Sequence, residues 1–430
     1  MPGPRAVVVV TGSELVRGGR SDLNGPFLAQ ELVWLGLEPA EIVVVGDRPE
    51  ELERVVGEAL EADLAVFSGG LGPTHDDRTV ELIARAAGRR IVLVPELERE
   101  IETVSRSVSE RLGRPYADFA PGVRKQASLP EGAVALGLAG TAPAFLLEHD
   151  NCVTVALPGP PGELRRLWPN AVAHPAFRRV VSRARRREHR VLRFFGPGES
   201  QVARALDEAG GDGDGVEVTV CARDLEIHVD LFVEPGGETR LEALEEELRE
   251  RFGDQLFAED ERAVEELVLD LCRRQGLTLA TAESCTGGLV GARLTSIPGA
   301  SDVYVGGVVA YANGVKVAGL GVAPELLEGH GAVSAEAAAA MARGARAELG
   351  AEVAVAVTGV AGPGGGTAEK PVGLVHLCAS SADGELAQRL ELPGDREAIR
   401  ARAAVAALHL LRRLLTQAGT DSARPGHTQA

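Results

Sequence analysis

The sequence predicts an α/β protein with a doubly wound, mostly parallel sheet at its N-terminus, a small α+β module in the middle and a second α/β domain at its C-terminus. Two observations lead to this prediction. Apolar runs rich in β-branched residues alternate with helix-length stretches, which is typical of buried parallel strands. The chain has 430 residues, which is too long for a single hydrophobic core. We therefore expect two or three domains.

The N-terminal domain is placed at residues 1–172. Its expected strands are the short apolar runs 6–10, 42–46, 64–68 and 153–157. Three of these runs end in polar, Gly-rich loops, with the sequences TGSEL, GGLGPTHDD and PGPPGEL. In open α/β sheets, ligands bind beyond the carboxyl ends of the strands. We therefore expect the three loops to form one site.

The middle module is placed at residues 173–260, where a strand, a helix, two strands and a helix follow one another. Its first part holds the most basic stretch of the chain, RRVVSRARRREHR, which is either an Arg-rich connector or an anion-binding patch. The C-terminal domain is placed at 261–416, where helices again alternate with buried strands. Residues 417–430 are expected to be a disordered tail.

Composition argues against several classes of function. The formal net charge is −18, and a wide nucleic-acid-binding face is not expected because phosphate contacts need clustered Lys and Arg. No apolar run approaches the roughly 18 residues of a membrane span, and the N-terminus lacks a signal-peptide pattern. The five cysteines are scattered without a CxxC pair, which argues against disulfides or a zinc site. A cytoplasmic protein is expected.

Lysine and asparagine are almost absent from this composition. The lysines are Lys125, Lys316 and Lys370. The asparagines are Asn24, Asn151, Asn170 and Asn313. The few lysines and asparagines that remain are expected at positions where Arg or Asp could not perform the same role. Arg cannot give up a proton, so a required amine base would have to remain Lys.

The segment TAESCTGG (281–288) places Ser284 at the junction of a buried strand and a helix. A serine there is exposed at the sheet edge, and free N–H groups of the following turn can face a developing oxyanion. Thr286, Gly287 and Gly288 are candidate binding residues, since the glycines let a ligand approach the backbone. The structural alternative is that Ser284 caps the helix by accepting its N–H bonds.

The next strand end, YANGVK, favours catalysis at Ser284. It brings the rare residues Tyr311, Asn313 and Lys316 within six positions. A serine activated by lysine, with or without tyrosine, can attack an amide or ester carbonyl, and burial can lower the pKa of lysine toward neutrality. The alternatives are a solvated lysine at a helix start and a tyrosine with its hydroxyl in water. Cys285 is the competing nucleophile, because a helix N-terminus would acidify its thiol.

The loop TGVAGPGGGTAEKP (358–371) follows another buried strand. Its glycine-dense backbone suits a phosphate or ribose, and a flexible hairpin loop is the alternative. It has no GK[ST], so ATP use is not implied. Arg396 and Arg400 open the last helix and could reach a phosphate, or are ordinary surface arginines. The candidate binding residues of this region are Thr358, Gly359, Ala361, Gly362, Gly364, Gly365 and Arg396.

In the N-terminal domain, Glu14, Asp76 and Asp77 lie on two of the expected site loops. Carboxylates are hard oxygen ligands, so the three are candidate ligands of a divalent metal. The alternative for the two aspartates is N-capping of the helix that follows them, RTVELIARAAG.

These motifs resemble those of the CinA (competence/damage-inducible) family. TAESCTGG, GGVVAYANGVK, GAVSAEAAAAMA, TGVAGPGGG and KPVG are similar, in order and spacing, to the family's C-terminal domain, which is itself similar to the bacterial nicotinamide mononucleotide amidohydrolases. The resemblance implies hydrolysis of nicotinamide mononucleotide to nicotinate mononucleotide and ammonia without a cofactor. On this resemblance Ser284 is the nucleophile, Lys316 the base and Tyr311 an assisting group.

The N-terminal half resembles the family's molybdopterin-binding-like domain through TGSELVRG, SGGLGPTHDD, KQASLP, AGTAPAF and LPGPPGEL. Some members hydrolyse the pyrophosphate of ADP-ribose there with a divalent metal. Gly137, Ala144 and Ser13 stand where Asn, Gly and Thr are usual. Ala144 is expected in a loop close to the ligand, so an N-terminal activity is less strongly predicted than the C-terminal one.

Two functions of different classes are consistent with these observations. The first is a pyridine-nucleotide salvage enzyme with two sites, which acts on small nucleotides as a homodimer. The second is a nucleotide-sensing scaffold with competence or repair proteins as partners and vestigial sites. The intact set of Ser284, Tyr311 and Lys316 favours the first, because a sensor has no need of a base. A molybdenum-cofactor enzyme rests on fold analogy alone.

Overall fold

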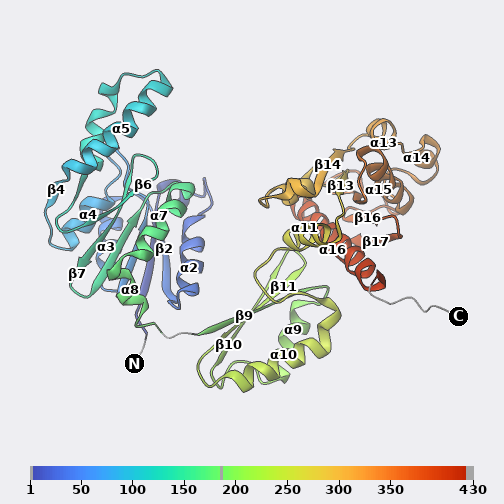
Figure 1. The fold of residues 1–430 in the computed structure, drawn as a ribbon, viewed down its shortest axis with the longest axis horizontal. Helices are drawn as coiled ribbons and strands as arrows, with labels where there is room; N and C mark the ends of the chain where they lie inside the picture. The colour runs from blue at the N-terminus through green and yellow to red at the C-terminus, as the bar shows by residue number, and fades with distance from the viewer. Residues whose placement is uncertain (1–2, 185–186, 423–430) are drawn as a thin grey trace. The chain divides into compact units, whose positions relative to one another are not determined.

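The computed structural model describes residues 3–184 and 187–422. The chain forms two compact units, Met1–Arg187 and Glu188–Ala430, which are described separately below (Figure 1). The second unit contains both the middle module and the C-terminal α/β domain.

The sheet of the first unit has the strand order β2-β1-β3-β8-β7-β6. Four strands are parallel, namely β1 (Ala6–Thr11), β2 (Pro39–Val45), β3 (Leu64–Ser68) and β8 (Cys152–Leu157). β7 (Pro143–His149) and β6 (Val134–Leu138) extend the sheet in antiparallel register. The predicted doubly wound, mostly parallel sheet is confirmed.

Helices cover both faces of this sheet. α2 (Asn24–Trp34), α7 (Pro161–Ala173) and α8 (Pro175–Val181) pack on one face. α3 (Pro49–Ala59), α4 (Thr79–Ala86), α5 (Pro95–Leu112) and α6 (Ala120–Gln126) pack on the other. The shorter elements are α1 (Ser13–Val16), β4 (Ile91–Leu93), η1 (Tyr116–Asp118) and β5 (Ser128–Pro130). Because both faces are covered, the central strands are apolar throughout, which explains the continuous β-branched runs.

The middle module follows the predicted order of elements. It consists of β9 (Glu188–Phe195), α9 (Glu199–Glu208), β10 (Val216–Arg223), β11 (Glu226–Val233), α10 (Glu238–Phe252), η2 (Gly253–Gln255) and β12 (Leu256–Ala258). Its strands lie in the order β10-β11-β9-β12. Alternate residues of β11 are buried against the two helices, and the polar residues between them face the other way.

The basic stretch before β9 forms surface ion pairs. Arg183, for example, pairs with Asp63, as expected for an Arg-rich connector.

The C-terminal domain has the strand order β14-β13-β15-β16-β17. β13 (Leu279–Glu283) lies parallel between β14 (Tyr304–Val309) and β15 (Val353–Gly359), and β16 (Leu374–Ser380) and β17 (Glu385–Glu391) are antiparallel. One face carries α11 (Val264–Gln275), α12 (Leu289–Thr295) and α16 (Arg396–Ser422). The other carries α13 (Asn313–Leu320), α14 (Pro324–His330) and α15 (Ala335–Leu349), and η3 (Ala300–Asp302) precedes β14.

The closing helix is longer than predicted. α16 continues to Ser422, so residues 417–422 of the expected disordered tail are helical. The rest of that tail, 423–430, lies outside the described residues. Among the described residues, no helix has both the length and the apolar character that a bilayer crossing requires.

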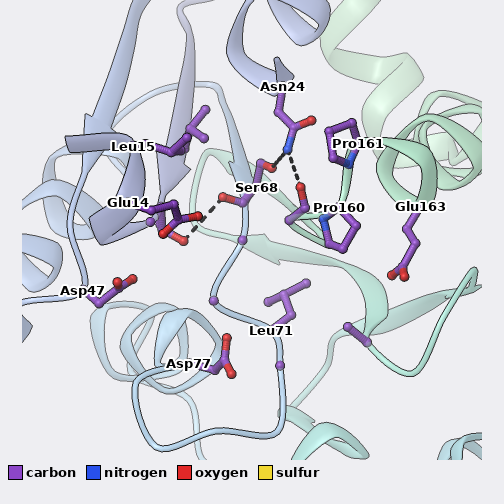
Figure 2. Close-up of a pocket in the computed structure, with 18 of the residues that line it drawn as sticks. Glu14, Leu15, Asn24, Asp47, Ser68, Leu71, Asp77, Pro160, Pro161 and Glu163 are labelled. Carbon is purple, nitrogen blue, oxygen red and sulfur yellow. Dashed lines mark hydrogen bonds between the residues drawn. The ribbon is translucent and has the colours of Figure 1, made fainter. Parts of the chain in front are cut away.

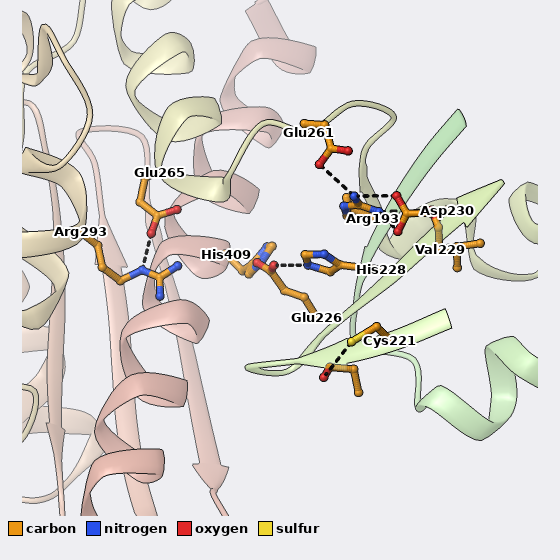
Figure 3. A network of polar contacts seen from close by, with 11 residues as sticks. Arg193, Cys221, Glu226, His228, Val229, Asp230, Glu261, Glu265, Arg293 and His409 are labelled. Carbon is orange, nitrogen blue, oxygen red and sulfur yellow. Dashed lines mark hydrogen bonds and ion pairs between the residues drawn. The ribbon is translucent and has the colours of Figure 1, made fainter. Parts of the chain in front are cut away.

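A polar network connects the middle module to α16 within the second unit (Figure 3). His409 of α16 is completely buried and stacks on Phe195, with ring centroids 3.9 Å apart. Its Nε2 lies 2.7 Å from Glu226 Oε1, and His228 Nε2 lies 3.1 Å from Oε2 of the same carboxylate. Burial alone would raise the pKa of Glu226, but the hydrogen bonds from the two histidines outweigh it and hold that pKa at about 2. Burial lowers the pKa of His409, so a neutral imidazole donates to the carboxylate.

Candidate functional site

Ser284 follows directly on β13, the strand that lies between two parallel neighbours. Its N–H donates to the Val357 carbonyl of β15 at 2.9 Å, and the N–H of Ala310, after β14, donates to the Glu283 carbonyl at 2.7 Å. These bonds continue the sheet ladder to the carboxyl ends of all three strands. Ser284 is thus fixed at the edge where open α/β sheets bind their ligands.

Lys316 lies beside Ser284. It is buried, although it belongs to the beginning of α13, where a lysine side chain is often in solvent. Its Nζ is 3.1 Å from Ser284 Oγ, 2.6 Å from the Ala310 carbonyl oxygen and 3.4 Å from the Tyr311 carbonyl oxygen. Only 1% of the residue is exposed. The alternative of a solvated lysine at a helix start is therefore wrong, because α13 turns this side chain inward to the end of β13.

The surroundings of Lys316 make its charged form less favourable than it is in water. Burial lowers the pKa of the ammonium group below its ordinary value, since the charged form loses its hydration. The three oxygens around Nζ belong to uncharged groups. A neutral amine has two hydrogens and one lone pair, so it can donate to the carbonyls of Ala310 and Tyr311 and accept the proton of Ser284. This is the arrangement that a general base requires.

Cys285 does not have the environment of a reactive thiol. Its side chain belongs to the hydrophobic core beneath α16, and burial raises its pKa to about 11. The expected acidification at a helix N-terminus is therefore wrong, because desolvation of the thiolate outweighs the nearby N–H groups. The geometry favours Ser284 as the nucleophile.

The residue that caps α12 is Glu283. Its buried carboxylate accepts the N–H bonds of Gly288, Val290 and Gly291 at 2.8 to 3.0 Å. The capping alternative for Ser284 is thus contradicted. No sequence signal pointed to Glu283, because it precedes the helix by more residues than a capping box allows.

A cavity of about 190 Å³ opens in front of Ser284 and Lys316. Its predicted lining residues are Ser284, Tyr311, Asn313, Lys316, Thr358, Gly359, Ala361 and Arg396. Cys285, Ala332 and Val333 complete the lining. The last two were not predicted as site residues, and their apolar side chains carry no chemical signal in a sequence.

The phenol of Tyr311 pairs with Arg396 and not with Lys316. Its hydroxyl accepts a hydrogen bond from Arg396 at 3.0 Å, and 61% of the residue is exposed. Lys316 contacts the carbonyl of Tyr311 rather than its phenol. The phenol therefore lies at the mouth of the cavity with Arg396, which also donates to the Gly362 carbonyl at 2.6 Å.

Other predicted binding residues lie outside the lining of this cavity. These are Thr286, Gly287, Gly288, Gly362, Gly364 and Gly365. Arg400 does not face a phosphate site either. Its Nε and Nη2 donate to the carbonyls of Cys285 and Thr286 at 3.2 and 2.8 Å.

The first unit contains a larger cavity of about 640 Å³ at the carboxyl ends of β1, β3 and β8 (Figure 2). The loops after these strands all line it, as predicted. Asn24 connects them, because its Nδ2 donates to Ser68 Oγ at 2.9 Å and to the Gly159 carbonyl at 2.7 Å. This rare asparagine is 6% exposed and supplies a donor that Asp lacks.

Glu14, Asp76 and Asp77 also line this cavity, but their carboxylate oxygens do not all lie within 4.8 Å of one another. In the described parts of the chain, the one group of three such ligands within 4.8 Å is His189, Asp230 and Glu261 in the second unit. That group already surrounds the buried guanidinium of Arg193, which pairs with both carboxylates (Figure 3).

The capping alternative for the two aspartates is also wrong. α4 begins after Arg78, without a side-chain cap. Asp77 instead accepts the Thr74 N–H at 2.9 Å, and the Thr74 hydroxyl, with its single hydrogen, lies within hydrogen-bond reach of both aspartates. The aspartates therefore stabilise the turn of the loop that lines the cavity.

The three unusual residues of the N-terminal half do not themselves line the cavity, although Ser13 lies next to residues that do. Ala144 is a fully buried core residue of β7, not a loop residue close to the ligand, and it pairs with Gly137 of β6. The Ser13 hydroxyl accepts the Asp47 N–H at 3.1 Å, and the Ser13 N–H donates to the Asp47 carboxylate. None of the three lines the cavity, so they do not weaken the prediction of a site there.

The two units define an α/β protein with two separate candidate sites, a carboxylate-lined cavity on a doubly wound sheet and a buried serine–lysine pair on a second sheet. Three family models match this chain. They are the probable molybdopterin binding domain at residues 7–179, the damage-inducible protein CinA KH domain at 189–258 and the CinA C-terminal domain at 261–415. The chain belongs to the CinA family.

Curated relatives support the same assignment along the whole chain. A CinA-like protein of Mycolicibacterium paratuberculosis is 44% identical over 96% of this chain and 99% of its own length. A CinA-like protein of Mycobacterium leprae is 43% identical over 97% and 98%. Among solved structures, the competence/damage inducible protein CihA of Agrobacterium tumefaciens is 43% identical, with a TM-score of 0.35, and covers 37% of this chain and 100% of that one.

Proposed function

We propose that the second unit hydrolyses the carboxamide of nicotinamide mononucleotide to nicotinate mononucleotide and ammonia. The observation that carries this proposal is the buried Lys316 Nζ, 3.1 Å from Ser284 Oγ, at the inner end of a cavity. The resemblance of the surrounding motifs to nicotinamide mononucleotide amidohydrolases supplies the substrate, and the serine–lysine geometry supplies the chemistry.

The reaction follows from the geometry of the pair. Ser284 Oγ attacks the amide carbon while its proton passes to neutral Lys316, and the carbonyl oxygen becomes an oxyanion. Lys316 then donates this proton to the amide nitrogen, the C–N bond breaks and ammonia leaves an ester on Ser284. A water molecule gives its proton to Lys316 and attacks this ester. The acid is released and Ser284 regains its proton from Lys316.

The volume of the cavity indicates which end of the substrate lies inside it. Its volume of about 190 Å³ is below the range of roughly 300 to 1,000 Å³ that encloses a whole drug-sized ligand. We therefore place the pyridine carboxamide inside the cavity and the ribose phosphate at its mouth. Arg396, which lies at the mouth with Tyr311, is the cation suited to contact the phosphate.

The test of this proposal is ammonia release from nicotinamide mononucleotide by the purified full-length protein. The Ser284→Ala variant should lose activity, and Cys285→Ala, which removes a buried thiol of the same cavity, is the matched control and should retain it. Activity that survives in Ser284→Ala but disappears in Cys285→Ala would overturn the assignment of the nucleophile. An inactive wild type would instead favour the nucleotide-sensing scaffold.

We propose a second activity for the first unit, the hydrolysis of the pyrophosphate of ADP-ribose. The supporting observation is the cavity of about 640 Å³, which can enclose a dinucleotide-sized ligand and is lined by carboxylates. Such oxygens suit a divalent cation, but Glu14, Asp76 and Asp77 are not assembled around one point.

AMP release from ADP-ribose, with and without Mg²⁺, tests this second proposal. Asp77→Asn should lower the rate, whereas Glu148→Gln, at a surface ion pair with Arg179, should not. Equal rates for all three proteins would contradict a role of the cavity.

A further inference from the structure

The segment after the nucleophile is held from two sides by charged groups that do not face the cavity. Glu283 is 1% exposed, and its carboxylate binds three N–H groups, of Gly288, Val290 and Gly291, where α12 begins. Arg400, on α16, binds the carbonyls of Cys285 and Thr286. A buried carboxylate and a guanidinium that contact main-chain atoms of one short turn fix its peptide planes.

The orientation of these peptides follows from trans geometry. In a trans peptide the carbonyl and the following N–H point in opposite directions. The carbonyl of Cys285 points to Arg400, so the N–H of Thr286 points away from it. The Ser284 carbonyl accepts the Gly287 N–H at 3.1 Å, which closes the turn and fixes the direction of the Cys285 N–H in the same way.

The N–H groups of Cys285 and Thr286 have no strong hydrogen-bond acceptor within the described parts of the protein. Among the described residues, the N–H groups of Cys285 and Thr286 donate to no oxygen of the protein. Both lie close to the Cys285 sulfur, a weak acceptor, where they oppose the rise of its pKa by burial. Cys285 lines the cavity, and its N–H belongs to the residue immediately after Ser284. In many serine hydrolases the N–H of that residue binds the oxyanion.

We propose that Arg400 and Glu283 are positioning residues, which hold the N–H groups of Cys285 and Thr286 as the donors for the oxyanion that forms when Ser284 attacks a carbonyl. This proposal rests on the proposed amidase function, which supplies the substrate. The same two donors would bind the oxygen of any electrophile that Ser284 attacks, so the role of Arg400 and Glu283 does not require nicotinamide mononucleotide.

The consequence is a specific kinetic effect. Loss of one oxyanion donor typically lowers kcat by roughly 10² to 10³. Removal of the guanidinium in Arg400→Leu frees both carbonyls of the turn, so kcat should fall by about 10²-fold with KM little changed. Arg400→Lys, which can retain one of the two bonds, should recover part of this loss. Glu283→Gln should also lower kcat, because an amide can present N–H rather than oxygen to the start of α12.

The experiment uses the full-length protein and two readouts. The first is kcat and KM for ammonia release from nicotinamide mononucleotide. The second is the rate at which a small alkyl fluorophosphonate modifies Ser284, measured by mass spectrometry. In that reaction the Oγ–P bond forms, fluoride leaves with its bonding electrons, Lys316 takes the serine proton, and the phosphoryl oxygen occupies the oxyanion position.

Arg402→Leu is the matched control. Arg402 lies on the same helix and donates to the Pro393 carbonyl, away from the turn. We expect Arg400→Leu to slow phosphonylation and amide hydrolysis by similar factors, and Arg402→Leu to change neither. If Arg400→Leu does not fold, Arg400→Lys and Glu283→Gln provide the test, with thermal unfolding as the check of the fold.

The outcomes separate the two proposals. A wild type that is phosphonylated at Ser284 but does not hydrolyse nicotinamide mononucleotide overturns the proposed substrate, and phosphonylation then tests the positioning role alone. Wild-type rates in the Arg400 and Glu283 variants overturn the positioning role, as does an equal loss in Arg402→Leu. A wild type that is not phosphonylated at Ser284 also overturns it.

Discussion

Lys316 Nζ lies 3.1 Å from Ser284 Oγ, although the two residues are 32 positions apart in the sequence. They meet because β13 and β14 are parallel neighbours, so that the turns after both strands reach the same edge of the sheet. α13 begins directly after that edge and directs Lys316 back toward Ser284.

The first prediction concerns the pH dependence of amide hydrolysis. Lys316 acts as a base only when it is unprotonated, and burial lowers its pKa below the ordinary value of 10.5. kcat should therefore rise with pH and level off above the folded-state pKa, within the range below 10.5. Lys316→Arg cannot deprotonate, so kcat should fall by roughly 10² to 10⁴ and the rising limb should disappear. A pH profile of ammonia release checks this, and an unchanged profile in Lys316→Arg would exclude Lys316 as the base.

The second prediction concerns stability at the same residue. In the unfolded chain Lys316 is protonated below pH 10.5, whereas the fold disfavours its charged form. This cost is fully present below the folded-state pKa and disappears as the pH rises toward 10.5. Lys316→Met should therefore raise the free energy of unfolding at pH 7 while it abolishes activity. Urea denaturation at pH 7 measures the change, and Lys370→Met, at a partly exposed lysine that donates to the His330 carbonyl, is the control. A destabilised Lys316→Met would contradict the argument.

The third prediction concerns Asn24 in the first unit. Asn24→Ala removes the donor to Ser68 and to the Gly159 carbonyl and should lower the free energy of unfolding by roughly 1 to 3 kcal/mol. Asn24→Asp should also destabilise the unit, because a carboxylate would face the Gly159 carbonyl oxygen without a hydrogen to share. Urea denaturation ranks the two variants. An Asp variant as stable as the wild type would show that the two bonds do not hold the loops together.

The fourth prediction concerns Ala144. Ala144→Gly restores the residue that is usual in the family, but the side chain lies in the core of β7 and not at the cavity. The change should lower the free energy of unfolding by roughly 0.5 to 1 kcal/mol, because glycine loses more conformational freedom on folding. The rate of ADP-ribose hydrolysis should stay the same. An increased rate would show that Ala144 does affect the N-terminal site.

The fifth prediction concerns His409 and the pH dependence of stability in the second unit. Burial lowers the pKa of His409 below 6.5, so its contribution to stability is fully present above pH 6.5 and is lost as the pH falls through the folded-state pKa. The carboxyl of Glu226 adds a second loss between pH 4.5 and about 2. His409→Phe keeps the stacking on Phe195 and should reduce the pH dependence just below 6.5.

Urea denaturation of the full-length protein between about pH 8 and pH 5, where histidine titrates, measures this effect. His330→Phe, at an exposed histidine, is the control. The same slope in wild type and His409→Phe would show that His409 does not titrate with unfolding.

The sequence predicted the fold well because both sheets are built from buried strands, whose apolar runs are local features. It also predicted which loops share a site, because the carboxyl ends of parallel strands meet at one edge. It did not predict Glu283 or Arg400 in their roles, because both act through main-chain atoms. A carboxylate that caps a helix from the preceding strand and an arginine that binds carbonyls of a distant turn leave no pattern in the chain.

For this protein, the sequence by itself determined the two sheets, the family and the presence of a rare lysine near a strand-end serine. Only the tertiary structure decided the environment of that lysine. Sequence alone left open whether Lys316 is solvated or buried, whether Ser284 or Glu283 caps the helix, and whether the thiol of Cys285 is acidic. Each answer depends on desolvation and on hydrogen-bond partners from other strands and helices, and these exist only when distant segments have packed together.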